Sequence, residues 1–180
     1  MMYAKPTFYF RLLVLSLIIN EIIARVEFTN IKCMTLDKDF AEFEYCTLKA
    51  INRTYKYASG KFKLFKLPIT KAKVNFGLFK RYNGYKPFLY NQTIDVCYFF
   101  NHQKSNPVAK YLFDIIRGTT NVNHSCPYNH DIIVDKISTE VVNHHTTRVL
   151  SVPDGDYMLE TRWILNDKPS AVIQIYLTLV

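Results

Sequence analysis

Apolar and polar residues alternate in several stretches of the chain, and this period of two constrains the fold more than any other sequence feature. In VPDGDYMLETRWIL, residues 152–165, the odd positions carry Tyr157, Leu159 and Trp163. The same alternation occurs over residues 41–45, 61–64, 72–78 and 173–179. Successive side chains of a strand point to opposite faces of a sheet. Each stretch is therefore predicted to be a half-buried strand of an antiparallel sheet.

Turn residues separate these stretches. Asn83-Gly84 and Pro153-Asp154-Gly155 have the composition of tight turns, because glycine accepts backbone angles that other residues avoid. Tyr157, just after the second turn, resembles the tyrosine corner of sandwich folds. Many short strands joined by regular turns indicate a β-sandwich or barrel, and the 15% content of aromatic residues fits such a fold. No linker or repeat occurs, and we expect a single, mainly β domain over residues 26–180.

One stretch has a helical period instead. In SNPVAKYLFDIIRG, Asn106 suits the helix cap, Pro107 the first helical position and Gly118 the stop. Its apolar residues recur at helical spacing: Val108, Tyr111, Leu112, Ile115 and Ile116. The sequence thus predicts one amphipathic helix near residues 107–117, which lies on the sandwich or plugs one of its ends.

The first 24 residues have the composition of a signal peptide. Lys5 and Arg11 precede a short apolar run over residues 12–19, and Ala24 offers a cleavage position. A transmembrane helix needs about 20 apolar residues, so this run is too short to span a bilayer comfortably. We expect a signal peptide over residues 1–24 and a secreted, extracellular mature protein; an uncleaved anchor is the alternative.

Export changes how the four cysteines are interpreted. No two lie at the Cys-x-x-Cys spacing of zinc and redox motifs, and an even number in an exported chain favours two disulfides. Of the three possible pairings we favour Cys33–Cys46 and Cys97–Cys126, because each pair brackets a local unit. Export also predicts N-glycosylation at the three Asn-x-Ser/Thr triplets, which begin at Asn52, Asn91 and Asn123.

The formal charge of +8 comes largely from lysines between Lys61 and Lys86. We interpret Lys61, Lys63, Lys71 and Lys73 as the solvent-facing sides of two strands, with an anionic membrane surface as the alternative partner. Nucleic acid is not expected as a partner of a secreted chain without a basic arm. No catalytic or phosphate-binding motif occurs, and no spacing of histidines suits a metal, so we expect no enzyme, no metal site and no cofactor.

Several stretches carry a family resemblance: NIKCMTLDKDFAEFEYCTLKAINRTYKY, PFLYNQTIDVCYF, NPVAKYLFDIIRGTTNVNHSCPYNHDIIV and VPDGDYMLETRWI. The chain resembles a large insect family of secreted proteins that has a domain-of-unknown-function label and is related to the CheB chemosensory proteins. More distantly, the segment from Cys97 to Pro127 and the strand at Gly155-x-Tyr157 are similar to the ganglioside-activator protein and the ML lipid-recognition superfamily.

This resemblance implies an immunoglobulin-like, ML-like antiparallel β-sandwich whose sheets part at one edge to admit a hydrocarbon ligand. The chain departs from the pattern in one respect. Several ML proteins join an early cysteine to one in the last strands, but this chain has no cysteine after Cys126. The width of a pocket is therefore not transferred from that superfamily.

Two functions fit these features. The first is a secreted binding protein for a lipid or another apolar small molecule, with chemosensation as one setting. The alternative is a secreted protein-interaction or co-receptor module with a closed sandwich, no ligand pocket and a partner such as a membrane receptor. Each inward aromatic residue fits ordinary core as well as a pocket. The pocket candidates are Phe62, Leu64, Val74, Phe76, Leu78, Leu112, Ile115, Tyr157, Leu159, Trp163, Ile173, Ile175 and Leu177.

Overall fold

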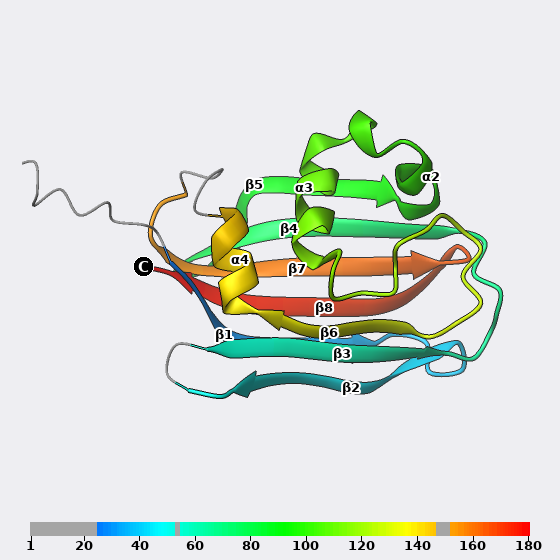
Figure 1. Cartoon of the computed structure of the whole chain (residues 1–180), viewed down its shortest axis with the longest axis horizontal. Helices are drawn as coiled ribbons and strands as arrows, with labels where there is room; N and C mark the ends of the chain where they lie inside the picture. Colours follow the sequence, from blue (N-terminus) through cyan, green and yellow to red (C-terminus); the bar gives the residue numbers. More distant parts are fainter. Residues whose placement is uncertain (1–24, 53–54, 147–151) are drawn as a thin grey trace, which may run out of the picture.

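Two antiparallel sheets form the protein (Figure 1). The computed structural model describes residues 25–52, 55–146 and 152–180, so the predicted signal peptide lies outside the described residues. The larger sheet contains, in spatial order, β1 (Val26–Thr35), β8 (Lys168–Leu179), β7 (Gly155–Leu165), β4 (Ala72–Tyr82) and β5 (Gly84–Asp95). The smaller sheet contains β2 (Ala41–Ala50), β3 (Lys56–Leu64) and β6 (Ile132–Ser138). The predicted mainly β fold of two antiparallel sheets is confirmed.

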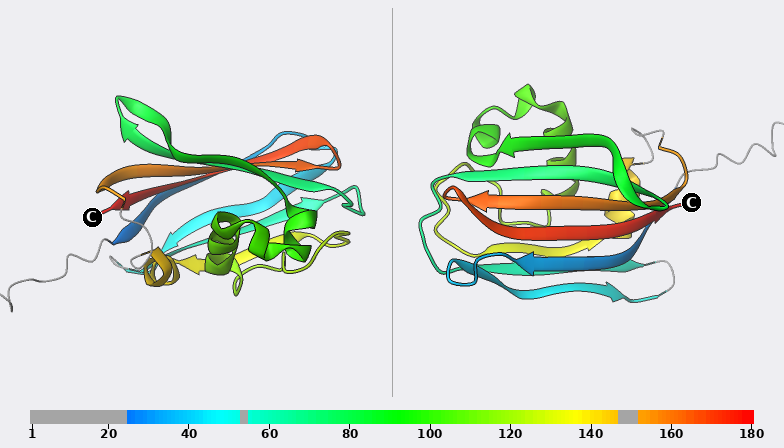
Figure 2. Two further views of the ribbon diagram at one scale, coloured as in Figure 1. Left: turned by 90° about the horizontal axis from the view of Figure 1, so that it is seen from above. Right: turned by 180° about the vertical axis from the view of Figure 1, so that it is seen from behind.

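The smaller sheet shares its layer with helices. The helix α3 (Pro107–Ile116) and the helix α4 (Thr139–Thr146) lie on the same side of the larger sheet as β6 (Figure 2, left). Seen from behind, the opposite face of the larger sheet is not covered by any described helix or strand (Figure 2, right). We call the covered side the inner face and the other side the outer face. None of the described helices is long and apolar enough to cross a membrane.

The helix α3 forms almost where it was predicted. The Asn106 side chain accepts a hydrogen bond from the Ala109 N–H at 3.0 Å, and Pro107 is the first helical residue. Further short helices form beside this predicted one: α4, α2 (Val96–Asn101) and the short 3-10 helix η1 (Gln103–Ser105). At six residues, α2 is too short to show a helical period in the sequence, and its visible signal is the Asp95 carboxylate, which caps the Tyr98 N–H at 2.9 Å.

Two disulfides connect the layers, and both are the favoured pairings. Cys33 of β1 joins Cys46 of β2, which ties the two sheets together along one edge. Cys97 of α2 joins Cys126 in the segment before β6. The two lysine-rich strands, β3 and β4, belong to different sheets, and the chain crosses between them around Pro68.

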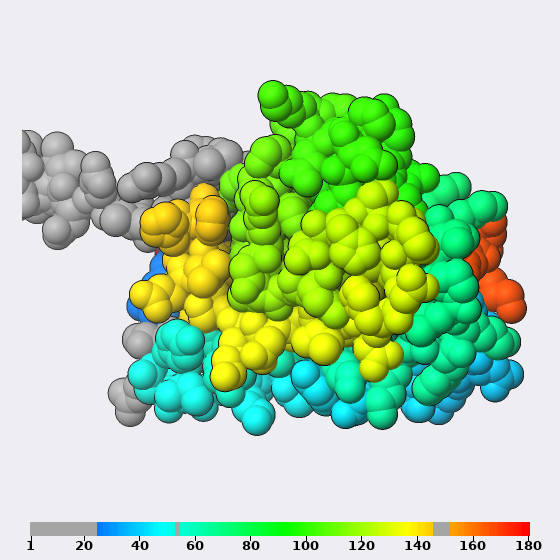
Figure 3. All heavy atoms as spheres, turned by 45° about the vertical axis from the view of Figure 1, so that its right-hand side comes forward, coloured from blue at the N-terminus to red at the C-terminus, as the bar shows by residue number. Residues whose placement is uncertain are grey.

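Buried apolar side chains concentrate in two places. The cluster at one end of the sandwich, which we call the closed-end core, contains Phe40, Ala41, Phe62, Leu64, Ile69, Ala72, Val96, Tyr128, Leu165 and Ala171. The segments before β4 and before β6, which pair at Ile69 and Tyr128, lie side by side at this end (Figure 3). The second cluster, which we call the α3 core, contains Phe76, Ile94, Phe99, Ala109 and Phe113. The middle of the larger sheet belongs to neither cluster.

Candidate ligand-binding site

The inner face of the larger sheet is an apolar surface centred on Leu159. β7 is the middle strand of the five, and Leu159 lies directly opposite Leu78 of β4 and Ile175 of β8. Residues opposite one another in an antiparallel pair point to the same face, so these three side chains lie together. Ile173 and Leu177 extend the same row along β8.

These inner-face side chains are less buried than their position predicts. Closely packed sheets bury the inner side chains of their central strands. Leu165 and Ala171, at the closed end, follow this rule with exposed fractions of 6% and 2%. In contrast, a set that we call the open stretch remains only half-buried and belongs to neither core: Leu78, Leu159, Ile173, Ile175 and Leu177. Among the described residues, the side chains of the second layer therefore leave part of the open stretch in contact with solvent.

The other pocket candidates lie around the open stretch. Phe62 and Leu64 are buried in the closed-end core, and Val74 and Trp163 pack against it. Phe76 belongs to the α3 core, against which Leu112 packs; Ile115 is half-buried on α3. Tyr157 is fully buried at the other end of β7.

Tyr157 forms the predicted tyrosine corner. Its hydroxyl donates a hydrogen bond to the Pro153 carbonyl, four residues upstream. Gly155, between the two, has a φ of +134°, in the region that favours glycine. These two features fix the entrance of β7 and so the position of Leu159 two residues later.

Lys80 ends the apolar row of β4, and the sequence reasoning missed it as a site residue. The inner-facing residues of β4 run through Phe76 and Leu78 to Lys80, which lies opposite Tyr157. Its ammonium nitrogen is 5.2 Å from the centre of the Tyr157 ring and 5.8 Å from that of Phe88. The signal was present, because Lys80 continues the even-numbered series that alternation places on the inner face.

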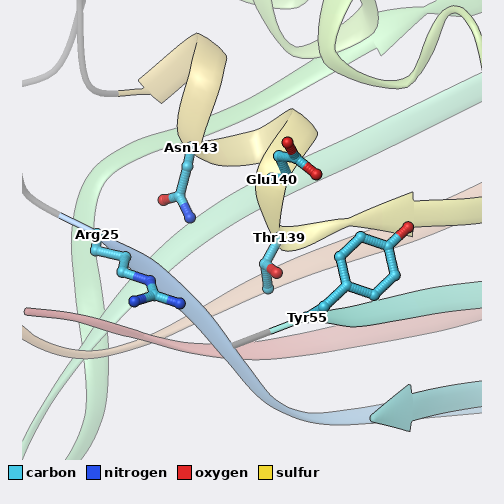
Figure 4. A pocket seen from close by; sticks show the side chains of 5 residues that line it. All are labelled: Arg25, Tyr55, Thr139, Glu140 and Asn143. Carbon is cyan, nitrogen blue, oxygen red and sulfur yellow. The ribbon is translucent and has the colours of Figure 1, made fainter. Parts of the chain in front are cut away.

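A pocket of about 280 Å³ lies beside α4, and its lining was not predicted from the sequence (Figure 4). The lining residues are Arg25, Tyr55, Thr139, Glu140 and Asn143. The Asn143 amide bonds both backbone groups of Val26, at 2.5 Å and 3.1 Å, and the Thr139 hydroxyl donates to the Lys56 carbonyl at 3.4 Å. These polar groups hold α4 against β1 and β3, so we place the candidate site on the inner face instead.

Of the four lysines that were predicted to face solvent, Lys61 and Lys63 of β3 and Lys71, just before β4, pair with acids. Lys61 lies 2.8 Å from Glu44, and this hydrogen bond raises the pKa of the lysine and lowers that of the carboxylate. Lys71 lies 2.7 Å from Asp167 with the same consequence for both pKa values. Lys73 is exposed on the outer face. Binding of an anionic membrane surface stays a prediction.

The outer face of the larger sheet carries a polar network around Glu160. Arg162 and Gln174 each donate to the Glu160 carboxylate at 2.7 Å. Burial raises the pKa of this carboxyl, but the two hydrogen bonds outweigh burial and lower the pKa from its ordinary value. The network is directed away from the open stretch.

The structure also bears on the predicted glycosylation sites and on metal binding. Asn52, Asn91 and Asn123 are exposed, which a glycan requires, and glycosylation stays a prediction. Among the described residues, no three His, Cys, Asp or Glu side chains lie together in a way that could hold a metal ion.

Comparison with known proteins gives a family match and several distant structural neighbours, two of which are described here. Residues 74–159 match the family described as protein of unknown function (DUF1091). Chicken MD-1 complexed with lipid IVa has a TM-score of 0.36 and 11% identity, over 86% of this chain and 97% of that one. A Niemann-Pick type C2 protein from the Japanese carpenter ant has a TM-score of 0.34 and 12% identity, over 86% and 90% of the two chains. No curated protein matches the sequence.

The family match covers the chain from β4 to β7 and agrees with the predicted domain-of-unknown-function label. A relation to the CheB proteins stays a prediction. No site residue is transferred from either structural neighbour, because both likenesses are distant.

Proposed function

We propose that this chain is an extracellular protein that binds a lipid or another apolar small molecule between its two layers, without catalysis. The observation that carries this proposal is the half-buried open stretch on the middle strands of the larger sheet. An unfilled apolar surface of this kind loses dispersion contacts and stays in contact with water. A hydrocarbon chain that covers it recovers about 0.8 kcal/mol for each buried methylene group.

The covalent framework supports an extracellular setting for this binding. Both disulfides suit an oxidising compartment, and the cysteines are all paired. Secretion through residues 1–24, glycosylation and a role in chemosensation belong to the same proposal. A membrane receptor is a further partner that such a carrier requires when it delivers a signal.

Ligand binding is tested directly with the mature chain. Native mass spectrometry after mild extraction should show retained apolar mass. Fatty acids, glycolipids and cuticular hydrocarbons should each be tested for displacement of an apolar dye and for a saturable change in Trp163 fluorescence, because this residue lies beside the open stretch and is the only tryptophan. If none of these compounds binds, the carrier proposal is wrong and the interaction-module alternative takes its place.

A pair of matched variants locates the binding surface. Leu159→Phe adds volume inside the open stretch, and we expect it to weaken lipid binding at least tenfold. Leu36→Phe makes the same exchange at a residue that is 53% exposed outside the inner face, and it should bind as the parent protein does. Equal binding by both variants would place the ligand elsewhere on the protein.

A further inference from the structure

Two lysines lie side by side at the end of the apolar inner face. Lys80 of β4 is directly opposite Lys86 of β5, so both side chains belong to the inner side of this hairpin. Like charges directly opposite one another in an antiparallel pair repel and destabilise the sheet. The pairing therefore places two positive charges side by side, although Lys80 also has structural partners in the turn before β7.

The surroundings of the two lysines do not neutralise this charge. The Lys80 ammonium donates to the backbone carbonyls of Pro153 and Asp154, at 3.4 Å and 3.1 Å, and lies over aromatic rings. All of these partners are uncharged. Within the described part of the chain, neither lysine has a carboxylate at salt-bridge distance. The neighbouring Arg81, by contrast, pairs with Asp156 across the outer face at 3.3 Å.

The lysine pair adjoins the open stretch. Lys80 follows Leu78 by two residues on the same face of β4, and Leu78 lies opposite Leu159. The hairpin of β4 and β5 turns away from the helical layer at this end (Figure 2, left), and Lys86 is exposed there. A molecule lying along the open stretch thus reaches from an apolar surface to two cations.

We infer that the ligand is an anionic amphiphile: its carboxylate or phosphate head binds Lys80 and Lys86, and its hydrocarbon tail lies on the open stretch. This inference rests on the proposed function and specifies its ligand class. Two ammonium groups supply charge-assisted hydrogen bonds to the head, which are the stronger kind. The same head relieves the repulsion between the two lysines, so binding and hairpin stability are linked.

The test compares a lipid with its neutral and tail-free counterparts. Palmitate has both head and tail, hexadecanol has the tail without the charge, and acetate has the charge without the tail. We expect palmitate to bind about tenfold or more tightly than hexadecanol, a difference of about 1.4 kcal/mol or more. Acetate should not bind measurably. Acetate binding as tight as that of palmitate would show a site for free anions and overturn the inference.

Lysine variants assign the preference to these two residues. Lys80→Met and Lys86→Met each remove one charge and keep the aliphatic chain, so both should reduce the preference for palmitate over hexadecanol. Lys86 is exposed, so Lys86→Met keeps the test valid if Lys80→Met folds poorly. Lys80→Arg retains the positive charge and should keep the preference for palmitate that Lys80→Met loses. Lys73→Met, on the outer face of the same strand, is the matched control and should not change it.

The outcomes separate the two proposals. Equal binding of palmitate and hexadecanol, unchanged in the lysine variants, would overturn the inference about the head while the carrier function stands. Absence of binding by every long-chain compound would overturn the carrier function and, with it, this inference.

Discussion

The contrast between Leu159 and Leu165 allows a direct test of whether the sandwich is filled at one end only. Both residues lie on the inner side of β7, six positions apart, and both are leucines, so one substitution probes two packing environments. Leu165 is 6% exposed within the closed-end core, whereas Leu159 is half-buried in the open stretch. The change is Leu→Ala at each position.

The expected free-energy costs differ because only one site leaves a new cavity. At Leu165 the truncation loses buried methyl groups and opens a void, which costs about 2–5 kcal/mol. At Leu159 part of the side chain already contacts water and no closed void forms. The cost is then the transfer free energy of the covered carbons without a cavity term, about 2 kcal/mol or less.

Guanidinium unfolding followed by far-ultraviolet circular dichroism measures both costs without using Trp163, which is close to Leu165 in sequence. In a separate thermal melt of the same variants, the melting temperature should fall by about 2–4 °C for each kcal/mol of lost stability in a domain of this size. Repeating the measurement with saturating lipid gives a second contrast. Lipid at 100 times the Kd of the parent should stabilise the parent and the Leu165→Ala variant by about 2.7 kcal/mol, and the more weakly binding Leu159→Ala variant by less.

Equal destabilisation by the two substitutions would refute this reasoning. It would mean that Leu159 is packed as tightly as Leu165 and that the space between the layers is filled. The partial exposure of the open stretch would then have no consequence for binding.

Three further predictions concern the frame around the site. Gly155→Val should lower the free energy of unfolding by about 1–3 kcal/mol, because valine strains a backbone with φ of +134°; an unchanged melting temperature would contradict this. Replacing Cys33 and Cys46 together by serine should cost about 3 kcal/mol by the loop-entropy model, measured by denaturant unfolding, and a cost near zero would show that this link does not constrain the unfolded chain. The pKa of Glu160 is lowered in the folded protein, so its contribution to stability is present above the ordinary value of 4.5 and is lost as the pH falls through the folded pKa. Glu160→Gln should therefore lose less stability than the parent in thermal melts as the pH falls below about 4.5, and identical acid profiles would exclude this role.

The sequence by itself determined the parts of the fold that depend on local rules. Period-two alternation located β4, β7 and β8, because a strand between water and a core must change polarity at each residue. The cap at Asn106 located α3, and loop composition located the turns before Gly84 and Gly155. β1 escaped this reasoning because its register shifts between Phe28 and Asn30, which breaks the period.

Only the tertiary structure decided which inward residues remain uncovered. Leu159 and Leu165 have the same residue type, strand and face, and no local pattern distinguishes them; their burial depends on what the second layer places opposite each one. Lys80 shows the same limit. The alternation along β4 placed Lys80 on the inner face. Its position opposite Lys86, however, depends on a register shift between β4 and β5 at Gly77 to Phe79. Alternation reports the face of a side chain, whereas packing and charge pairing depend on contacts between residues far apart in the chain.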